Sequence, residues 1–309
     1  MSTLNTWFSE CGQRLSNSDI LWDFPDRGCQ LPLKEWLNPR LSNLVANYGD
    51  IFDTVNDQVL FVLRQLENGL EWLPWWVVIA IIGFVAYGAL RKVGPAVLMA
   101  LSLVGIGMFG LWDDTMITLA LMFLSIIISV AIGVPVGLFM SASDTVERIV
   151  NPILDAMQTM PPFVYLIPVV FFMGLGNVAA IFAICIYALP PIVRLTNLGI
   201  RLVNPEVVEA AEAFGSSSHQ ILWGVKVPLA LPTLMAGLNQ TIMMAIAMAV
   251  IASMIGARGL GQEVLRGLNN GNVGHGLEAG LAILAIAIIF DRVTAAYGRR
   301  MDQSRPVQA

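Results

Sequence analysis

Uncharged, apolar runs long enough to cross a lipid bilayer follow one another from Leu73 almost to the end of the sequence. The longest run, from Ala156 to Val193, contains no Asp, Glu, Lys or Arg. About 20 residues of helix cross a ~30 Å hydrocarbon core, so this run is too long for one helix, and the Gly174–Asn177 turn divides it into two. We therefore expect seven spans, near 74–90, 93–111, 115–140, 157–173, 178–195, 229–254 and 277–296.

The composition is that of a chain whose solvent is mostly lipid. Only 13% of the residues are charged, against about a quarter in soluble domains, and the mean hydropathy is +0.71. The net charge of −5 lies almost entirely in the polar N-terminal extension, residues 1–72. We expect an all-α membrane protein with a transmembrane domain over 73–298 and a short tail over 299–309, surrounded by the lipid bilayer and without a nucleic-acid partner.

The N-terminal extension carries one apolar helical stripe. It opens without the basic-then-apolar pattern of a cleaved signal peptide, so we expect no processing. Near 51–70, apolar residues recur at intervals of three and four, which predicts an amphipathic helix: Phe52, Val55, Val59, Val62, Leu63, Leu66 and Leu70. Such a helix lies either along the membrane surface or on the protein itself, and its acidic polar face weakens the first interpretation.

The distribution of positive charge predicts the orientation of the spans. Lys and Arg gather in alternate connections, at 91–92, at 148, at 194–226 and at the C-terminal end, and the cytoplasmic side of a membrane protein is normally the positive one. The intervening loops hold Asp113 and Asp114, no charge at all, or a mixture of both signs. With seven spans, this places the C-terminus in the cytoplasm and the N-terminus outside, in the periplasm if the cell has two membranes.

The largest polar loop on the predicted cytoplasmic side covers residues 205–228. A helix should begin after Pro205 and end at Gly215, and serine caps should start a second helix, which stops at Pro228 where the next span begins. The result is a helical hairpin that projects from the membrane. Small residues and a fixed turn in such an element indicate that another protein surface fits against it.

This loop resembles the EAA loop of the permease subunits of binding-protein-dependent ABC importers. Glu209-Ala210-Ala211, then Gly215, then the segment Val225–Pro228 stand at the spacing of that motif, with valine where isoleucine and leucine are usual. The resemblance implies the type I importer permease fold. It also implies contact with an ATPase through these residues: Glu209, Ala210, Ala211, Gly215, Ser216 and Pro228.

Further segments resemble the glycine betaine/proline betaine permeases of osmoprotectant importers. The similarity covers roughly 70–300 and is carried by 155–166, 174–178, 189–196, 237–241, 250–255 and 259–261. It implies a homodimer, a cytoplasmic ATPase, a separate solute-binding protein, and a quaternary ammonium solute such as glycine betaine, proline betaine or choline. The chain lacks a phosphate-binding Gly-x-x-x-x-Gly-Lys-Ser/Thr loop, so we expect no cofactor in it and ATP-Mg on the partner ATPase. The chain should couple transport to hydrolysis and should not be an enzyme.

Two other functions are compatible with the sequence. The same fold could carry another small solute, such as an amino acid or a sulfonate, and sequence separates this alternative poorly from the first. An ion-coupled secondary transporter would need carboxylates near the bilayer midplane or an inverted repeat. Spans one to six hold no ionisable group well inside them, and no internal repeat is evident, so this alternative is weaker.

Candidates for a solute pathway are few. Gln158 and Asn239 are polar residues inside spans, where an interhelical hydrogen bond competes with solute contact. Phe163 and Tyr165 follow the Pro161-Pro162 pair, and aromatic faces attract methylated cations. His219 and His275 have no other metal-binding residues at the spacing of a metal site, so we expect no metal.

Three cysteines are scattered along the chain. Cys11 and Cys29 could form a disulfide if the N-terminal extension lies in an oxidising outer compartment, whereas Cys185, within span five, should remain a buried thiol.

Overall fold

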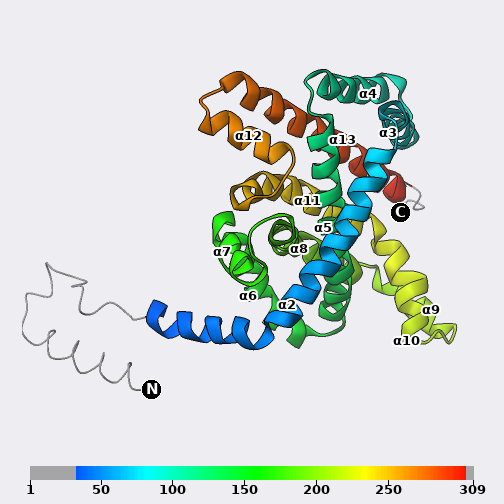
Figure 1. Ribbon diagram of the computed structural model, residues 1–309. Helices are drawn as coiled ribbons and strands as arrows, with labels where there is room; N and C mark the ends of the chain where they lie inside the picture. Colours follow the sequence, from blue (N-terminus) through cyan, green and yellow to red (C-terminus); the bar gives the residue numbers. More distant parts are fainter. Residues whose placement is uncertain (1–32, 304–309) are drawn as a thin grey trace, which may run out of the picture. The chain divides into compact units, whose positions relative to one another are not determined.

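The computed structural model describes residues 33–303, and this part of the chain contains helices and no strand (Figure 1). Contacts divide the chain into two units, Met1–Val55 and Asn56–Ala309. The division falls inside the helix α2 (Leu33–Trp72), a 40-residue helix that is much longer than the expected segment 51–70. In the first unit, the described residues form the first part of α2.

In the second unit, residues 56–72 of α2 pack against the helical bundle. Leu63 is 1% exposed and lies in a hydrophobic cluster with Ile117, Leu121 and Cys185, and its stripe neighbours at 59, 66 and 70 pack against the same cluster. The helix therefore lies on the protein over these residues, as the second of the two interpretations predicts.

The described part of the second unit contains four long helices and several shorter ones. The long ones are α5 (Trp112–Ala142), α8 (Asn177–Arg201), α11 (Val227–Ala252) and α13 (Val273–Gln303). The shorter ones are α3 (Trp75–Leu90), α4 (Val93–Met108), α6 (Asp144–Thr159), α7 (Pro162–Met173) and α12 (Leu260–Asn269). Among the described residues, four helices are long and apolar enough to cross a membrane, up to six if each of two bent helix pairs is one span, and α4 is a shorter apolar helix.

The fourth expected span, 157–173, is not one straight helix. α6 and α7 meet at an angle of 103°. Met160 is extended, with ψ 136°, because the proline after it disfavours helical geometry, and the proline pair then starts α7 at Pro162. The Gly174–Asn177 turn separates α7 from α8 as expected, with positive φ at Gly174 and Gly176.

The centre of the bundle is α8, which packs mainly against α5 and α11. Small residues allow these close approaches. A Cβ added to Gly137 on α5 would come within 2.6 Å of the Thr196 side chain, and one added to Gly237 on α11 would come within 2.9 Å of the Leu195 side chain. Glycine at such contacts is the usual way in which membrane helices pack closely.

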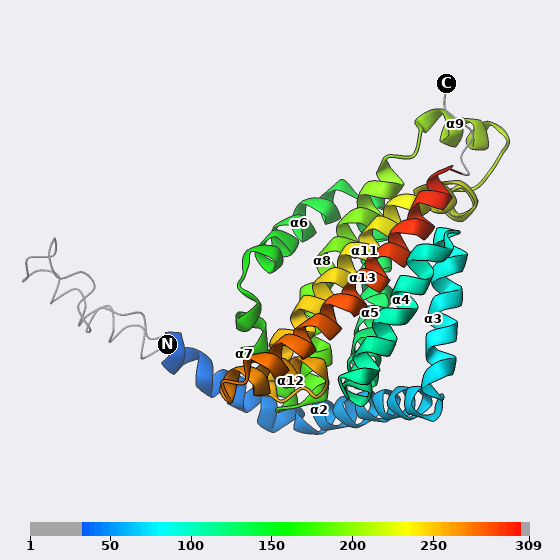
Figure 2. The same cartoon turned by 90° about the horizontal axis from the view of Figure 1, so that it is seen from above.

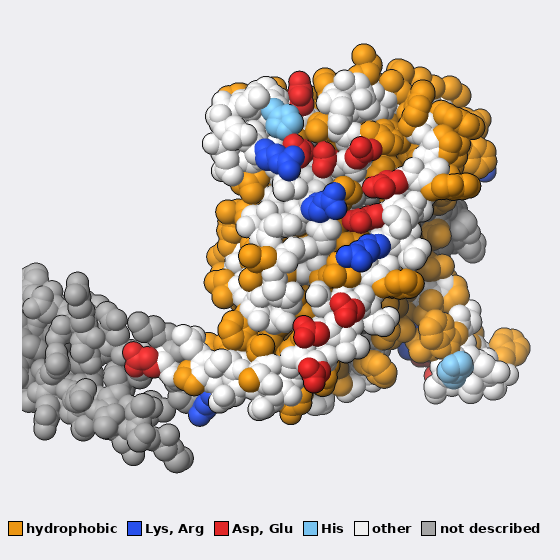
Figure 3. All heavy atoms as spheres, in the orientation of Figure 1, with side chains coloured by type: hydrophobic (Ala, Val, Ile, Leu, Met, Phe, Trp, Pro, Cys, Tyr) orange, Lys and Arg blue, Asp and Glu red, His pale blue; other side chains and the backbone are white. Residues whose placement is uncertain are grey.

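The surface of the second unit is apolar where a bilayer would surround it. Hydrophobic side chains cover the region of α3 and α4 (Figure 3), and these include Phe84, 77% exposed, and Leu98, 70% exposed. Figure 2 shows the short helix α9 (Pro205–Ala213), the α3–α4 junction and the C-terminal end of α13 at one end of the bundle, with α12 and α7 at the other. The connections that carry most of the positive charge thus share one end.

Candidate coupling site

The loop between α8 and α11 begins with α9, whose ends are closed by local hydrogen bonds. The Asn204 side chain caps the helix by accepting from the backbone N–H of Glu206. At the other end, Gly215 has φ +80°, and the backbone N–H groups of Gly215 and Ser216 donate to the carbonyls of Glu212 and Ala211. This is a Schellman motif, which requires a left-handed residue and therefore favours glycine.

The second helix of the hairpin, α10 (Ser218–Ile221), starts with a capping box in which Ser217 and Gln220 bond each other's backbone N–H groups. It does not stop at Pro228 as expected. A π-helical turn, η2 (Leu222–Lys226), joins α10 to α11, and the helix continues without a break through Pro228. A proline inside a continuous helix removes one backbone N–H donor and crowds the preceding turn, and the wider π turn directly before Pro228 accommodates it.

The hairpin presents a mixed surface of small, acidic and aromatic residues. Glu209 and Ala210 are exposed on α9, and the Glu209 side chain makes no hydrogen bond or ion pair within residues 33–303. Phe214, next to the turn, is 91% exposed, and Trp223 on η2 is 52% exposed. Sequence reasoning did not single out these two aromatic residues, although both lie inside the motif. An exposed ring on a rigid turn is a typical contact residue in protein interfaces.

The hairpin is attached directly to the two helices that pack most closely in the bundle. α9 follows α8 after three residues, and α10 continues through η2 into α11. α8 and α11 contact each other next to this attachment, where a Cβ added to Gly199 would come within 3.0 Å of the Thr233 side chain and 3.3 Å of Ala230. Displacement of the hairpin must therefore move both helices.

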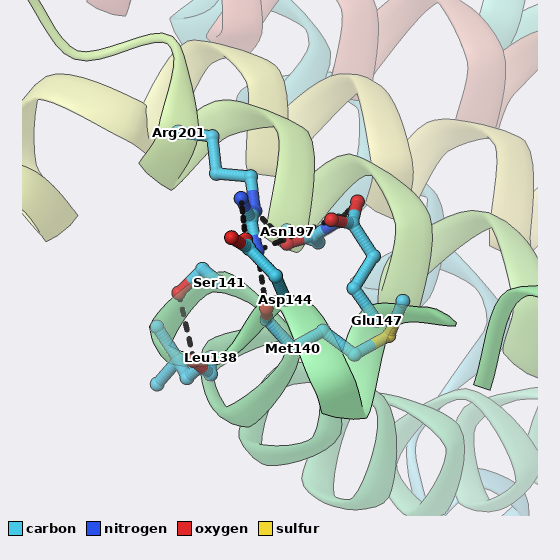
Figure 4. A network of polar contacts seen from close by, with 7 residues as sticks. All are labelled: Leu138, Met140, Ser141, Asp144, Glu147, Asn197 and Arg201. Atoms are coloured by element: carbon cyan, nitrogen blue, oxygen red, sulfur yellow. Dashed lines mark hydrogen bonds and ion pairs between the residues drawn. The ribbon is translucent and has the colours of Figure 1, made fainter. Parts of the chain in front are cut away.

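A polar network fixes the end of α8 just before the hairpin (Figure 4). The Arg201 guanidinium donates from Nη1 to Asp144 at 2.7 Å, from Nη2 to the Met140 carbonyl at 2.9 Å, and from Nε to the Asn197 side chain at 3.0 Å. Glu147 lies 3.1 Å from Nη2 and accepts a second bond, from the Asn197 amide, at 2.8 Å. The network ties α5 and α6 to α8. The sequence did contain a signal for this network. Two acidic residues stand three apart on α6, and Asn197 and Arg201 stand four apart on α8.

The four candidate pathway residues lie in different surroundings. Asn239 is held between α11 and α13, where its amide donates to Asp291 at 3.0 Å and its carbonyl accepts from Thr294. Tyr165 is 5% exposed and donates to the Met157 carbonyl, with its ring edge-on to Tyr187.

The other two are exposed. Phe163 is 51% exposed, whereas Gln158 lines a cavity of about 440 Å³ between α6, α8 and α11. The structure thus places five of the candidate coupling residues in one hairpin and Pro228 in the first turn of α11, and it does not bring the pathway candidates together.

The cysteines and the candidate metal ligands remain to be placed. Cys185 is a buried free thiol, whose Sγ lies 3.3 Å from the Ser125 carbonyl oxygen. Cys11 and Cys29 lie outside the described residues. Within 33–303, no cluster of three or more His, Cys, Asp or Glu side chains could hold a metal ion.

The fold and the hairpin define an importer permease, and comparison with known proteins agrees. Residues 129–303 match the family described as binding-protein-dependent transport system inner membrane component, and the chain belongs to this family. Over 87% of its length, it is 42% identical to the glycine betaine/proline betaine transport system permease protein ProW of Escherichia coli (strain K12), covering 76% of that protein. Over 87% of its length, it is 41% identical to the glycine betaine transport system permease protein OpuAB of Bacillus subtilis (strain 168), covering 95% of it.

A solved structure and a more distant relative complete the comparison. The fold resembles a chain of the MetNI methionine ABC transporter in inward-facing conformations, with a TM-score of 0.54 and 25% identity over 63% of this chain and 95% of that one. The trimethylamine N-oxide transport system permease protein TmoV of Pelagibacter ubique (strain HTCC1062) is 37% identical over 75% of this chain, which covers 32% of that protein. The expected resemblance to ABC importer permeases and the all-helical fold class are thus confirmed. The chain is a multi-pass membrane permease and a transport subunit, not an enzyme.

Proposed function

We propose that this chain forms the translocation pathway of an ATP-driven importer of quaternary ammonium solutes, with glycine betaine as the principal one. Relatives that are 41–42% identical over most of their length carry glycine betaine, proline betaine or carnitine in their names. In this proposal two copies of the chain form the pathway, a separate binding protein delivers the solute, and a separate ATPase binds and hydrolyses ATP-Mg. The N-terminus lies outside and the C-terminus in the cytoplasm.

The observation that carries the proposal is the exposed hairpin 205–226 that continues directly into α8 and α11. Closure of the ATPase against Glu209, Phe214 and the Gly215 turn would displace the hairpin. Because α8 and α11 pack together at small residues, they would move as one body and change which side of the membrane the pathway faces. Transmission through rigid packed helices is how small local displacements become alternating access.

The experiment is uptake of labelled glycine betaine in cells that lack other importers and express the chain together with a partner ATPase and a solute-binding protein. Glu209→Lys should abolish uptake without lowering the amount of permease in the membrane, because a reversed charge at an exposed interface position repels the ATPase without disturbing a contact inside the chain. Glu209→Gln keeps the shape and should retain part of the activity. Normal uptake by Glu209→Lys at wild-type expression would remove the coupling role.

The solute is tested in the same cells by competition. Unlabelled glycine betaine, carnitine, choline, methionine and taurine are added in excess during uptake. Competition by the methylated ammonium compounds alone supports the proposed solute class. Uptake of methionine or taurine in place of glycine betaine would assign the chain to one of the alternative solutes.

A further inference from the structure

The cavity of about 440 Å³ between α6, α8 and α11 has a polar lining that the coupling hairpin does not explain. Its polar residues are Asn151, Gln158, Arg194, Asn197 and Gln240. The volume lies within the roughly 300–1,000 Å³ that small-molecule sites occupy. The outer surface of the bundle is apolar, and polar groups within a membrane are costly. Those that occur there therefore normally serve a function.

Three of the amide side chains that line the cavity have no hydrogen-bond partner in the described part of the chain. The side chains of Asn151 and Gln158, on α6, and of Gln240, on α11, make no hydrogen bond within residues 33–303. Asn197 differs, because both ends of its amide are engaged by Glu147 and Arg201. The cavity therefore holds donors that converge from α6 and α11 without partners in the described chain.

Arg194 adds the one positive charge of this lining. Its side chain is 35% exposed, and within the described chain only its Nη2 has a partner, the carboxylate of Asp155. The Nε is buried without a hydrogen-bond partner. A guanidinium has five N–H donors, so this one keeps donors for a second acceptor. Carboxylates and phosphates both accept charge-assisted hydrogen bonds from a guanidinium, and of these two groups a betaine carries the carboxylate.

The cavity lies where a solute that crosses the permease could pass. Gln240 lies near the midpoint of α11, whereas Arg194 lies about 10 Å before Arg201 along α8, on the side of the coupling hairpin. The cavity thus extends from the middle of the bundle toward the hairpin end. Two of the three helices that line it, α8 and α11, are those to which the hairpin is attached.

We infer that this cavity is a carboxylate subsite, in which Arg194, Gln158 and Gln240 bind the carboxylate of a zwitterionic betaine on its way through the permease. The inference rests on the proposed function for the solute class. It adds that the permease itself distinguishes betaines and carnitine from choline, which has the same trimethylammonium group and no carboxylate.

Saturation-transfer NMR on the permease–ATPase complex, purified in maltoside detergent without the binding protein, tests the inference directly. The methyl protons of glycine betaine and of choline are observed in parallel, with protein-free micelles as the blank. In the wild type, glycine betaine should bind more tightly than choline. Arg194→Gln should raise the dissociation constant of glycine betaine by roughly tenfold, the loss expected for one charge-assisted hydrogen bond, and leave that of choline unchanged.

Two further variants separate binding from structure. Asp155→Asn breaks the ion pair but keeps the guanidinium, so it should retain the preference for glycine betaine. Gln158→Leu should weaken glycine betaine binding and serves in place of Arg194→Gln if that variant does not fold. Equal affinity for the two solutes in the wild type, or an equal loss for both in Arg194→Gln, overturns the subsite. Failure of wild-type cells to take up glycine betaine would instead remove the proposed function.

Discussion

Arg201, the last residue of α8, donates to Asp144, the first residue of α6, at 2.7 Å across 57 positions of sequence. The contact joins the helix that carries the coupling hairpin to the broken segment formed by α6 and α7. Any force that the hairpin applies to α8 therefore reaches α6 through this ion pair as well as through apolar packing.

Arg201→Ala should destabilise the protein by about 1–3 kcal/mol, because it removes two carboxylate contacts and a bond to a backbone carbonyl at a partly buried position. The measurement is thermal unfolding of the purified protein in detergent. Arg148→Ala is the matched control, since Arg148 is exposed on α6 and makes no ion pair within the described chain. Equal unfolding temperatures for the two variants would show that the network contributes nothing.

Gly215→Val should reduce uptake by roughly tenfold. A β-branched residue at φ +80° strains the turn by about 1–2 kcal/mol, so that the Schellman geometry is populated about tenfold less. Gly215→Asn should retain most uptake, because Asn tolerates the left-handed region. Gly224→Ala is a control in the same hairpin, since no atom lies within 4 Å of an added Cβ there. Wild-type uptake by Gly215→Val would refute a requirement for this turn.

Gly137→Ala should destabilise the bundle by about 1–3 kcal/mol, because the added Cβ would meet the Val193 carbonyl at 2.7 Å and force α5 away from α8. The amount of folded protein after detergent extraction and heating measures the effect. Gly280→Ala, on α13, has open space around the added Cβ and should behave like the wild type. Wild-type amounts of folded Gly137→Ala would show that α5 and α8 accommodate the added Cβ without cost.

A cysteine introduced at Ser218 should be labelled only by reagents on the cytoplasmic side, and one at Ser42 only from outside. The positive charge gathered at the hairpin end of the bundle is the physical reason. Each substitution is made in a protein whose three native cysteines are replaced by alanine, and labelling of intact cells is compared with that of inverted vesicles. Labelling of both positions from the same side would contradict the predicted topology.

Local features of the coupling hairpin could be predicted from the sequence because they depend on near neighbours. Pro205 starts α9, the Gly215 turn closes it, and the Ser217 cap starts α10, since caps and turns are made by residues a few positions apart. The break between α7 and α8 at Gly174–Asn177 could be predicted for the same reason, since its two glycines lie within the turn itself. The family could also be predicted, since spacing within one loop carried the resemblance.

Features that join distant parts of the chain were decided only by the tertiary structure. The sequence could not tell whether the stripe on α2 meets lipid or protein, because both are apolar, and Leu63 proved to be buried by α5 and α8. The spacing around Pro228 predicted a stop, whereas a π turn carries the helix through it. The partners of Arg201 and the gathering of Gln158, Arg194 and Gln240 at one cavity depend on how α6, α8 and α11 cross, and helix crossing is set by packing between surfaces far apart in sequence.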